Sequence, residues 1–178
     1  MLVNKIPCLD KGYVAYLDSS GNSSKLKNIA LEFFKKTDSK FLYDLSSLTV
    51  VIKCPLFVQL NLSQFGLKII NTPQSQLEAY CPSVGEIGSP DHATNKHIQD
   101  DILKTTEALH INPKAYQADG CDHFVAQVLT PISTYTTLIV HGSYNEWRRF
   151  VVQVNAPVSL TAYINAIEQI MNMEWKHV

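Results

Sequence analysis

Residues 134–150 have the sequence TYTTLIVHGSYNEWRRF, and this stretch decides the fold. Its first half is rich in β-branched residues and predicts a strand, whereas Ser143 is a good helix cap and predicts a helix over 144–152. The glycine between them permits close backbone approach, and a helix N-terminus offers N–H groups to an anion. Contact with a nucleotide or phosphate is therefore expected from the side chains around this turn: His141, Ser143, Asn145, Arg148 and Arg149. The alternative is an ordinary Ser-capped helix with solvated arginines or a subunit salt bridge.

Strands and helices are mixed along the rest of the chain. Residues 12–18 and 45–53 alternate or are β-branched, so they predict two more strands. Helices are expected over 23–34, 55–65, 95–109, 112–129 and 159–173. Residues 66–101 contain several Pro and Gly and predict a long loop with short structured pieces. We expect one α/β (α+β) domain over residues 1–178, with a central mixed sheet flanked by helices.

Composition excludes several classes of protein. With 46% hydrophobic and 17% charged residues among 178, the chain has enough apolar surface to fold, which excludes a disordered chain. No apolar run approaches the roughly 20 residues that a membrane-spanning helix needs. The formal net charge of -1 argues against a broad nucleic-acid surface.

Cysteine and histidine spacing gives no metal motif. The four cysteines, Cys8, Cys54, Cys81 and Cys121, contain no Cys-x-x-Cys pair. His92 and His97 do not have the i, i+4 spacing that places two ligands on one helix face. We therefore expect reduced thiols, a cytoplasmic location and no metal site.

Arginine is scarce, which limits phosphate chemistry. Two of the 15 basic residues are arginines, and they are adjacent. Arginine gives the planar, bidentate grip on phosphate that enzymes handling several phosphate groups use. This chain alone cannot supply a distributed set of such contacts.

Several segments together resemble one family, the flavin-dependent thymidylate synthases. They are LDKGYV at 9–14, LDSSG at 17–21, TVVIKCPLFV at 49–58, VLTP at 128–131, TYT at 134–136 and GSYNEWRRF at 142–150. The resemblance implies an α/β domain that assembles as a homotetramer with active sites shared between subunits. It also implies that flavin contacts come from His141, Ser143, Asn145 and Arg149.

The family's catalytic signature is not kept. Its Arg-His-Arg motif falls on Gln64-Phe65-Gly66 in one register and on Leu67-Lys68-Ile69 in the other. The closing arginine falls on Ala79, and the tyrosine after it is kept as Tyr80. Because each lost charge-assisted hydrogen bond is worth about 1.5–3 kcal/mol, the losses would weaken nucleotide binding by orders of magnitude. We therefore expect a pseudoenzyme with no catalytic residues.

The expected function is that of a non-catalytic, homo-oligomeric binding or regulatory protein in nucleotide metabolism. Its altered, nucleotide-like ligand is expected to contact Lys68, Thr72, Gln74, Ser75, Gln76, Tyr80 and Arg148. No cofactor is expected, or FAD if the family function is retained. One alternative is an active flavoenzyme that methylates dUMP with FAD and methylenetetrahydrofolate, or that modifies a related pyrimidine nucleotide. The other is a subunit whose missing arginines come from an intact synthase chain.

Overall fold

The core of the protein is a five-stranded antiparallel sheet. The computed structural model describes residues 5–20, 45–72, 78–87, 90–118 (backbone alone for 109–118), 132–153 and 156–175. The strands are β1 (Lys5–Cys8), β2 (Gly12–Ser20), β3 (Ser47–Pro55), β4 (Lys68–Thr72) and β5 (Tyr135–Ser143). Their order is β1-β2-β3-β5-β4, and each neighbouring pair is antiparallel. The α+β class is confirmed, but the expected mixed sheet is wrong in its strand directions.

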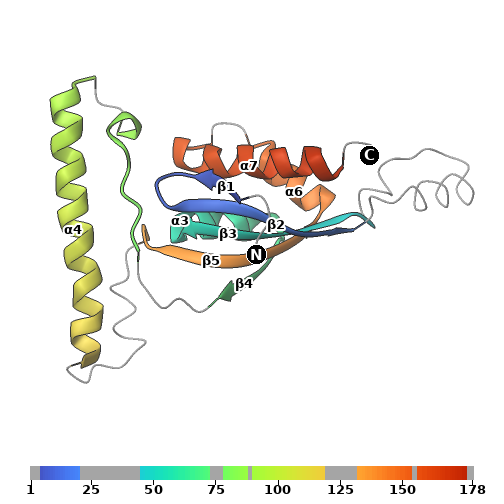
Figure 1. Cartoon of the computed structure of the whole chain (residues 1–178), viewed down its shortest axis with the longest axis horizontal. Coiled ribbons are helices and arrows are strands. Elements are labelled where there is room, and N and C mark those ends of the chain that lie inside the picture. Colours follow the sequence, from blue (N-terminus) through green and yellow to red (C-terminus); the bar gives the residue numbers. More distant parts are fainter. Residues whose placement is uncertain are drawn as a thin grey trace, which may run out of the picture.

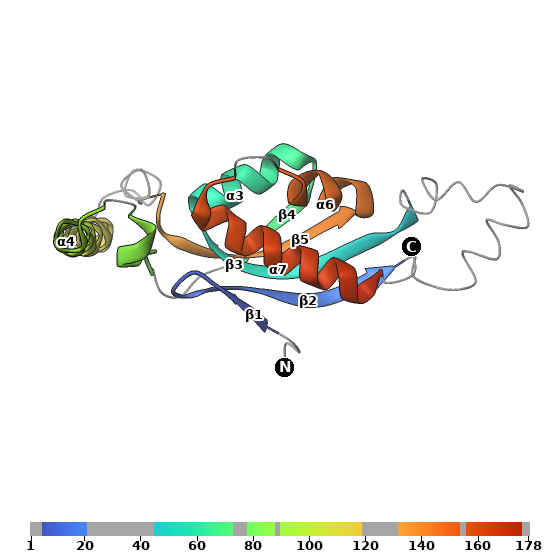
Figure 2. The same cartoon turned by 90° about the horizontal axis from the view of Figure 1, so that it is seen from above.

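Three helices cover one face of this sheet. They are α3 (Leu56–Leu62), α6 (Tyr144–Val151) and α7 (Val158–Glu174), and Figures 1 and 2 show them on the same side of the strands. A short 3-10 helix, η1 (Ser63–Phe65), continues α3, and a second, η2 (Val84–Glu86), precedes α4 (His92–Ala118). Helix α4 stands beside one end of the sheet (Figure 1). We call the sheet face opposite α3, α6 and α7 the open face.

The hydrophobic core lies between the sheet and these three helices. Alternate residues of the two central strands face it, because side chains in a strand alternate between faces. These fully buried residues are Leu48, Val50, Ile52 and Cys54 of β3 and Leu138 and Val140 of β5. Helix α7 contributes an apolar stripe to it, including Ile167 and Ile170. The Trp147 indole donates to the Leu48 carbonyl at 3.0 Å, which ties α6 to the central strand.

The sequence predicted the central elements well and the 66–118 region poorly. Residues 66–101, expected to be mainly a loop, contain strand β4 and the start of α4. Helix α4 continues through Asn112-Pro113, where we expected a second helix to begin. The apolar residues Ile98 and Leu103 of this helix are 36% and 43% exposed. The helix expected over 23–34, and residues 119–129 of the helix expected over 112–129, lie outside the described residues.

The reasons for these errors are physical. Strand β4 is an edge strand whose pairing with β5 overrides the weak local signal of KIINT. Helix α4 packs against the η2 segment rather than against the main core. The spacing of its apolar residues therefore does not indicate a face that is buried in that core. Despite its 27 residues, neither α4 nor another helix in the described ranges has the length and apolar character needed to cross a bilayer.

Gly12 is required where β2 begins. A Cβ atom at this position would lie 2.0 Å from the Tyr163 hydroxyl oxygen and 2.6 Å and 2.9 Å from the carbonyl oxygens of Cys8 and Lys53. The close approach lets the Tyr163 hydroxyl donate to the Lys53 carbonyl at 3.0 Å. Glycine therefore allows α7 to lock onto the β1–β2 hairpin and β3.

We predict that Gly12→Ala lowers the free energy of unfolding by about 1–3 kcal/mol, because two of the clashing atoms are backbone oxygens that cannot rotate away. Urea unfolding followed by circular dichroism measures the change. Gly85→Ala is the matched control, since a Cβ there meets nothing within 4 Å. Equal stability of the two variants would contradict the close packing at Gly12.

Candidate functional site

The open face carries ordered rows of side chains. Residues directly opposite each other in an antiparallel pair point to the same face. Because their strand neighbours are buried against the helices, three cross-strand rows belong to the open face. The rows are Asp18–Thr49–His141–Lys68, Ala15–Val51–Ile139–Ile70 and Tyr13–Lys53–Thr137–Thr72. Two polar rows therefore flank an apolar one.

Three of the residues expected to bind ligand lie on this face. His141 Nδ1 is 2.9 Å from the Thr49 hydroxyl oxygen, and the exposed Lys68 is the register partner of His141 on β4. The Thr72 hydroxyl, at the other end of β4, donates to the Thr137 carbonyl at 2.8 Å. Lys68 and His141 are thus neighbours, and Thr72 belongs to a separate row.

The N-terminal turn of α6 already holds a carboxylate. Glu146 Oε2 accepts the backbone N–H of Ser143 at 2.7 Å, and the Ser143 hydroxyl accepts the N–H of Glu146 at 3.3 Å. This reciprocal capping box satisfies N–H groups that an anion would otherwise bind. A flavin pyrophosphate does not fit this turn as it stands, because its charge would meet that of Glu146.

The two arginines lie at the other end of α6. Arg149 Nη2 donates to the Phe65 carbonyl at 3.3 Å, and the Arg148 side chain is exposed. Asn145 lies in the first turn, next to the capping box. The turn and the arginines are therefore on one short helix, with the arginines in its last turn.

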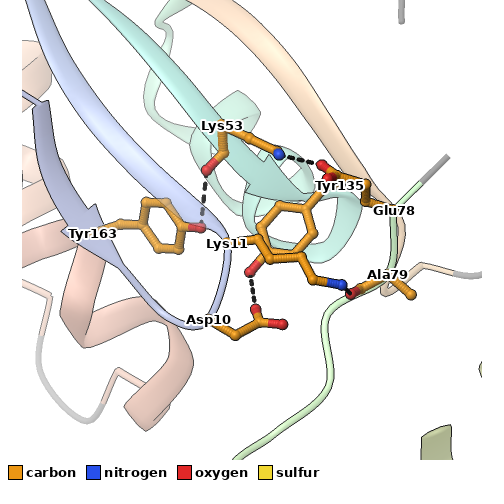
Figure 3. Close-up of polar contacts among 7 residues, drawn as sticks. All are labelled: Asp10, Lys11, Lys53, Glu78, Ala79, Tyr135 and Tyr163. Carbon is orange, nitrogen blue, oxygen red and sulfur yellow. Dashed lines mark hydrogen bonds and ion pairs between the residues drawn. The ribbon is translucent and has the colours of Figure 1, made fainter. Parts of the chain in front are cut away.

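A second group of polar side chains gathers at the opposite end of the strands. We call Asp10, Lys53, Glu78 and Tyr135 the strand-end cluster (Figure 3). The Tyr135 hydroxyl donates to Asp10 Oδ1 at 2.5 Å, and the Lys53 ammonium forms an ion pair with the Glu78 carboxylate. Lys53 Nζ also lies 5.6 Å from the centre of the Tyr135 ring. The side chains of Lys53 and Glu78 are 19% and 39% exposed, so a ligand can reach them.

The phenols around this cluster are neutral donors. Burial, followed by donation to Asp10, raises the pKa of Tyr135 far above its ordinary value. Burial likewise raises the pKa of Tyr80, whose hydroxyl donates to Glu86 at 3.0 Å, and burial raises the pKa of Tyr163. These side chains therefore donate hydrogen bonds at neutral pH and do not act as bases.

Sequence reasoning missed most of this cluster because its members are far apart in the chain. The β1–β2 hairpin brings Asp10 to this end, and a bridge between Ala79 and Thr134 holds Glu78 beside β5. The Lys11 ammonium also donates to the Ala79 carbonyl at 3.3 Å. One signal was available, since Lys53 is a cation inside an otherwise apolar strand.

Two of the predicted ligand residues border the cluster. Thr72 shares a cross-strand row with Lys53, and Tyr80 lies two residues after Glu78. The Tyr80 ring is 9% exposed and packs edge-on against Phe57, with ring centres 5.8 Å apart. Gln74, Ser75 and Gln76, also expected to bind ligand, lie outside the described residues.

Other chemistry receives no support from the described side chains. Within those ranges no three His, Cys, Asp or Glu side chains are grouped to hold a metal ion. Burial raises the pKa of Cys8 to about 12 and raises that of Cys54 and Cys81 as well. A thiol with a raised pKa is a poor nucleophile at neutral pH.

The strand-end cluster suits a neutral polar edge better than a phosphate. The cluster combines one ammonium and buried phenols as hydrogen-bond donors with two carboxylates as acceptors, and it carries no net positive charge. A phosphate would be repelled by Asp10 and Glu78, whereas a heterocycle with carbonyl and N–H groups side by side matches the pattern. The charges of the cluster therefore suit a neutral polar group better than an anion.

Comparison with known proteins identifies the fold. No protein-family model matches the sequence, and no curated protein sequence matches it. The structure is similar to the crystal structure of a UMP/dUMP methylase PolB from Streptomyces cacaoi bound with 5-Br dUMP. The TM-score is 0.73 over 92% of this chain and 91% of that chain, at 13% sequence identity. The expected thymidylate synthase-like architecture is thus supported at the level of the fold.

We predict that Tyr80, Tyr135 and Tyr163 stay protonated at pH values where ordinary tyrosines ionise, near pH 10. Because the folded state raises these pKa values, their contribution to stability is present below about pH 10 and declines as the pH rises further. Absorbance at 295 nm during alkaline titration measures the phenolates. In denaturant all eight tyrosines should titrate together, and identical native and denatured curves would contradict the burial.

Proposed function

We propose that this chain is a pyrimidine-nucleotide-binding protein on a thymidylate synthase-like scaffold, acting as an oligomeric binding or regulatory protein without the synthase reaction. The strand-end cluster is the observation that carries the proposal. It offers a uracil-like edge an ammonium for a carbonyl oxygen and carboxylates for the ring N–H. The fold supports the ligand class, because the similar methylase was crystallised with a dUMP analogue.

The positions on which the resembling family's Arg-His-Arg motif falls support the non-catalytic part of the proposal. Phe65 packs edge-on against Phe150 with ring centres 5.6 Å apart, and Leu67 is 7% exposed within the core. Gly66 has a left-handed φ of 80° and sits against the Glu146 and Arg149 side chains. These residues hold η1 to α6. The segment therefore contributes packing contacts at the positions where the family has charged side chains. A charged ligand loses its principal cations in this arrangement.

Binding would use the chain's own hydrogen-bonding groups. Tyr135 donates to one carboxylate oxygen of Asp10, and Lys53 contacts one oxygen of Glu78. Among the described contacts, the second oxygen of each carboxylate can therefore accept a hydrogen bond from a ligand. The partly buried position of Lys53 strengthens a hydrogen bond to a base carbonyl, because water competes less there. Of the expected ligand residues that the structure describes, Thr72 and Tyr80 lie at the border of the cluster.

A second candidate function is a flavoenzyme that methylates a pyrimidine nucleotide. The similarity of the fold to a methylase favours it. The α6 N-terminal turn weighs against it, because Glu146 occupies the place where a flavin pyrophosphate would need N–H donors.

We predict that the wild-type protein binds dUMP or UMP and that Lys53→Met weakens this binding at least about tenfold, equivalent to 1.4 kcal/mol. Isothermal titration calorimetry measures the dissociation constants, with AMP as the competing nucleotide class. Lys104→Met, on the exposed surface of α4, is the matched control and should bind like the wild type. Failure of the wild type to bind either pyrimidine nucleotide at millimolar concentration would refute the proposal.

We predict that the purified protein shows no flavin absorbance after incubation with FAD and desalting. The visible spectrum measures this directly. A retained yellow band would favour the second candidate, and methylation of dUMP or UMP with methylenetetrahydrofolate would then establish it.

A further inference from the structure

We propose that Lys5 binds the phosphate of the nucleotide and that Tyr13 positions the Lys5 ammonium group for this contact. The inference rests on the proposed function and deepens it, because it names the group that binds the charged part of the ligand. It starts from the charges of the strand-end cluster. Asp10 and Glu78 repel a phosphate, so a nucleotide whose base lies in the cluster needs a cation outside it.

The register of the sheet places Lys5 close to the cluster. Tyr13 on β2 is directly opposite Lys53 on β3, so the two side chains are neighbours on the open face, with Cβ atoms about 4.5–5.5 Å apart. On the other side of β2, Lys5 of β1 is opposite Ala15, in the adjacent cross-strand row. The Lys5 ammonium group reaches over the Tyr13 ring, 4.3 Å from its centre. The strand that carries Tyr13 therefore separates Lys5 from Lys53.

Lys5 keeps its charge available for an anion. Both ion pairs within the described ranges involve other side chains, so no carboxylate there neutralises Lys5. Its contact with Tyr13 is a cation–π interaction, in which an aromatic ring orients an ammonium group and leaves its charge in place. The Lys5 side chain is exposed, so a phosphate can approach it from solvent. A lysine binds phosphate as a point charge, and no bidentate arginine is needed for this contact.

The three other lysines of the sheet and of its β1–β2 hairpin suit this role less well. Lys53 belongs to the ion pair of the cluster, and the Lys11 ammonium group donates to a backbone carbonyl oxygen at 3.3 Å. Lys68 is exposed on β4, but its cross-strand row lies two rows from that of Lys53, whereas the row of Lys5 is adjacent. Each row adds about 6–7 Å along the strands, so Lys5 is the nearer cation.

The carboxylates of the cluster lie away from this phosphate position. Glu78 is held beside β5 and Lys5 is on β1, so the two residues are on opposite sides of β3 in the sheet. Asp10 lies in the turn after β1, whereas Lys5 begins that strand. A nucleotide that spans the two positions has its base at the cluster, its sugar against Tyr13 and its phosphate at Lys5. Loss of the Lys5 charge therefore affects a nucleotide and spares a nucleoside.

Calorimetric titration tests the inference by comparing UMP or dUMP with the matching nucleoside, which lacks the phosphate. Lys5→Met should raise the dissociation constant of the nucleotide about tenfold and leave that of the nucleoside unchanged, because it removes one charge-assisted contact to phosphate. Lys5→Arg retains the charge and should bind the nucleotide like the wild type. Tyr13→Leu should lower the preference for nucleotide over nucleoside in the wild type but not in Lys5→Met, since Tyr13 acts through Lys5. Lys104→Met is the control and should change neither constant.

The outcomes separate this inference from the proposed function. A wild type that binds neither nucleotide nor nucleoside refutes the proposed function, and the inference with it. A wild type that binds the nucleotide, together with a Lys5→Met variant of equal affinity, overturns the inference alone. So does a loss of nucleotide affinity that appears in Lys68→Met instead of Lys5→Met, or a loss in Lys5→Met that is equal for the nucleoside. Circular dichroism establishes that the variants are folded.

Discussion

The pairing of β3 with β5 is the interaction on which the rest of the structure depends. It joins nine consecutive residue pairs, from Ser47 with Ser143 to Pro55 with Tyr135, at the centre of the sheet. The paired residues are about 80 to 96 positions apart, so the contact closes a long loop whose entropic cost grows only slowly with length. Once the two strands are in register, α3 starts directly after β3 and α6 directly after β5. Both helices then fall on the same face of the sheet.

The same pairing explains what could be predicted from the sequence and what could not. The strands at 47–55 and 135–143 and the helices after them have strong local signals, namely β-branched runs, Pro55 and Ser143. Strand β4 has no such signal, because its partner β5 selects it. The helix that contains Pro113 is longer than local rules allow, and its packing on η2 is a tertiary contact that periodicity does not encode.

The candidate site divides in the same way. The sequence pointed to His141, Ser143 and Arg149 through a helix cap and an arginine pair, and the structure places the first two where β5 meets α6 and Arg149 in the last turn of α6. The strand-end cluster depends on three separate long-range contacts, between the hairpin and β3, between β5 and the hairpin, and between residues 78–79 and β5. No local pattern brings Asp10, Lys53 and Glu78 together, so folding was needed to reveal them. Lys53 shows the cost of this arrangement, because a half-buried ammonium requires its carboxylate partner.

The capping box of α6 also constrains how this scaffold could change. A helix N-terminus that is filled by its own Glu146 cannot gain a phosphate ligand by the addition of arginines alone, since the carboxylate must leave first. Removing Glu146 alone, however, leaves the Ser143 N–H without its acceptor and weakens a helix of eight residues. Each of the two changes is unfavourable until the other is present. A chain that carries this capping box therefore faces a barrier to gaining anion binding at this turn through single substitutions.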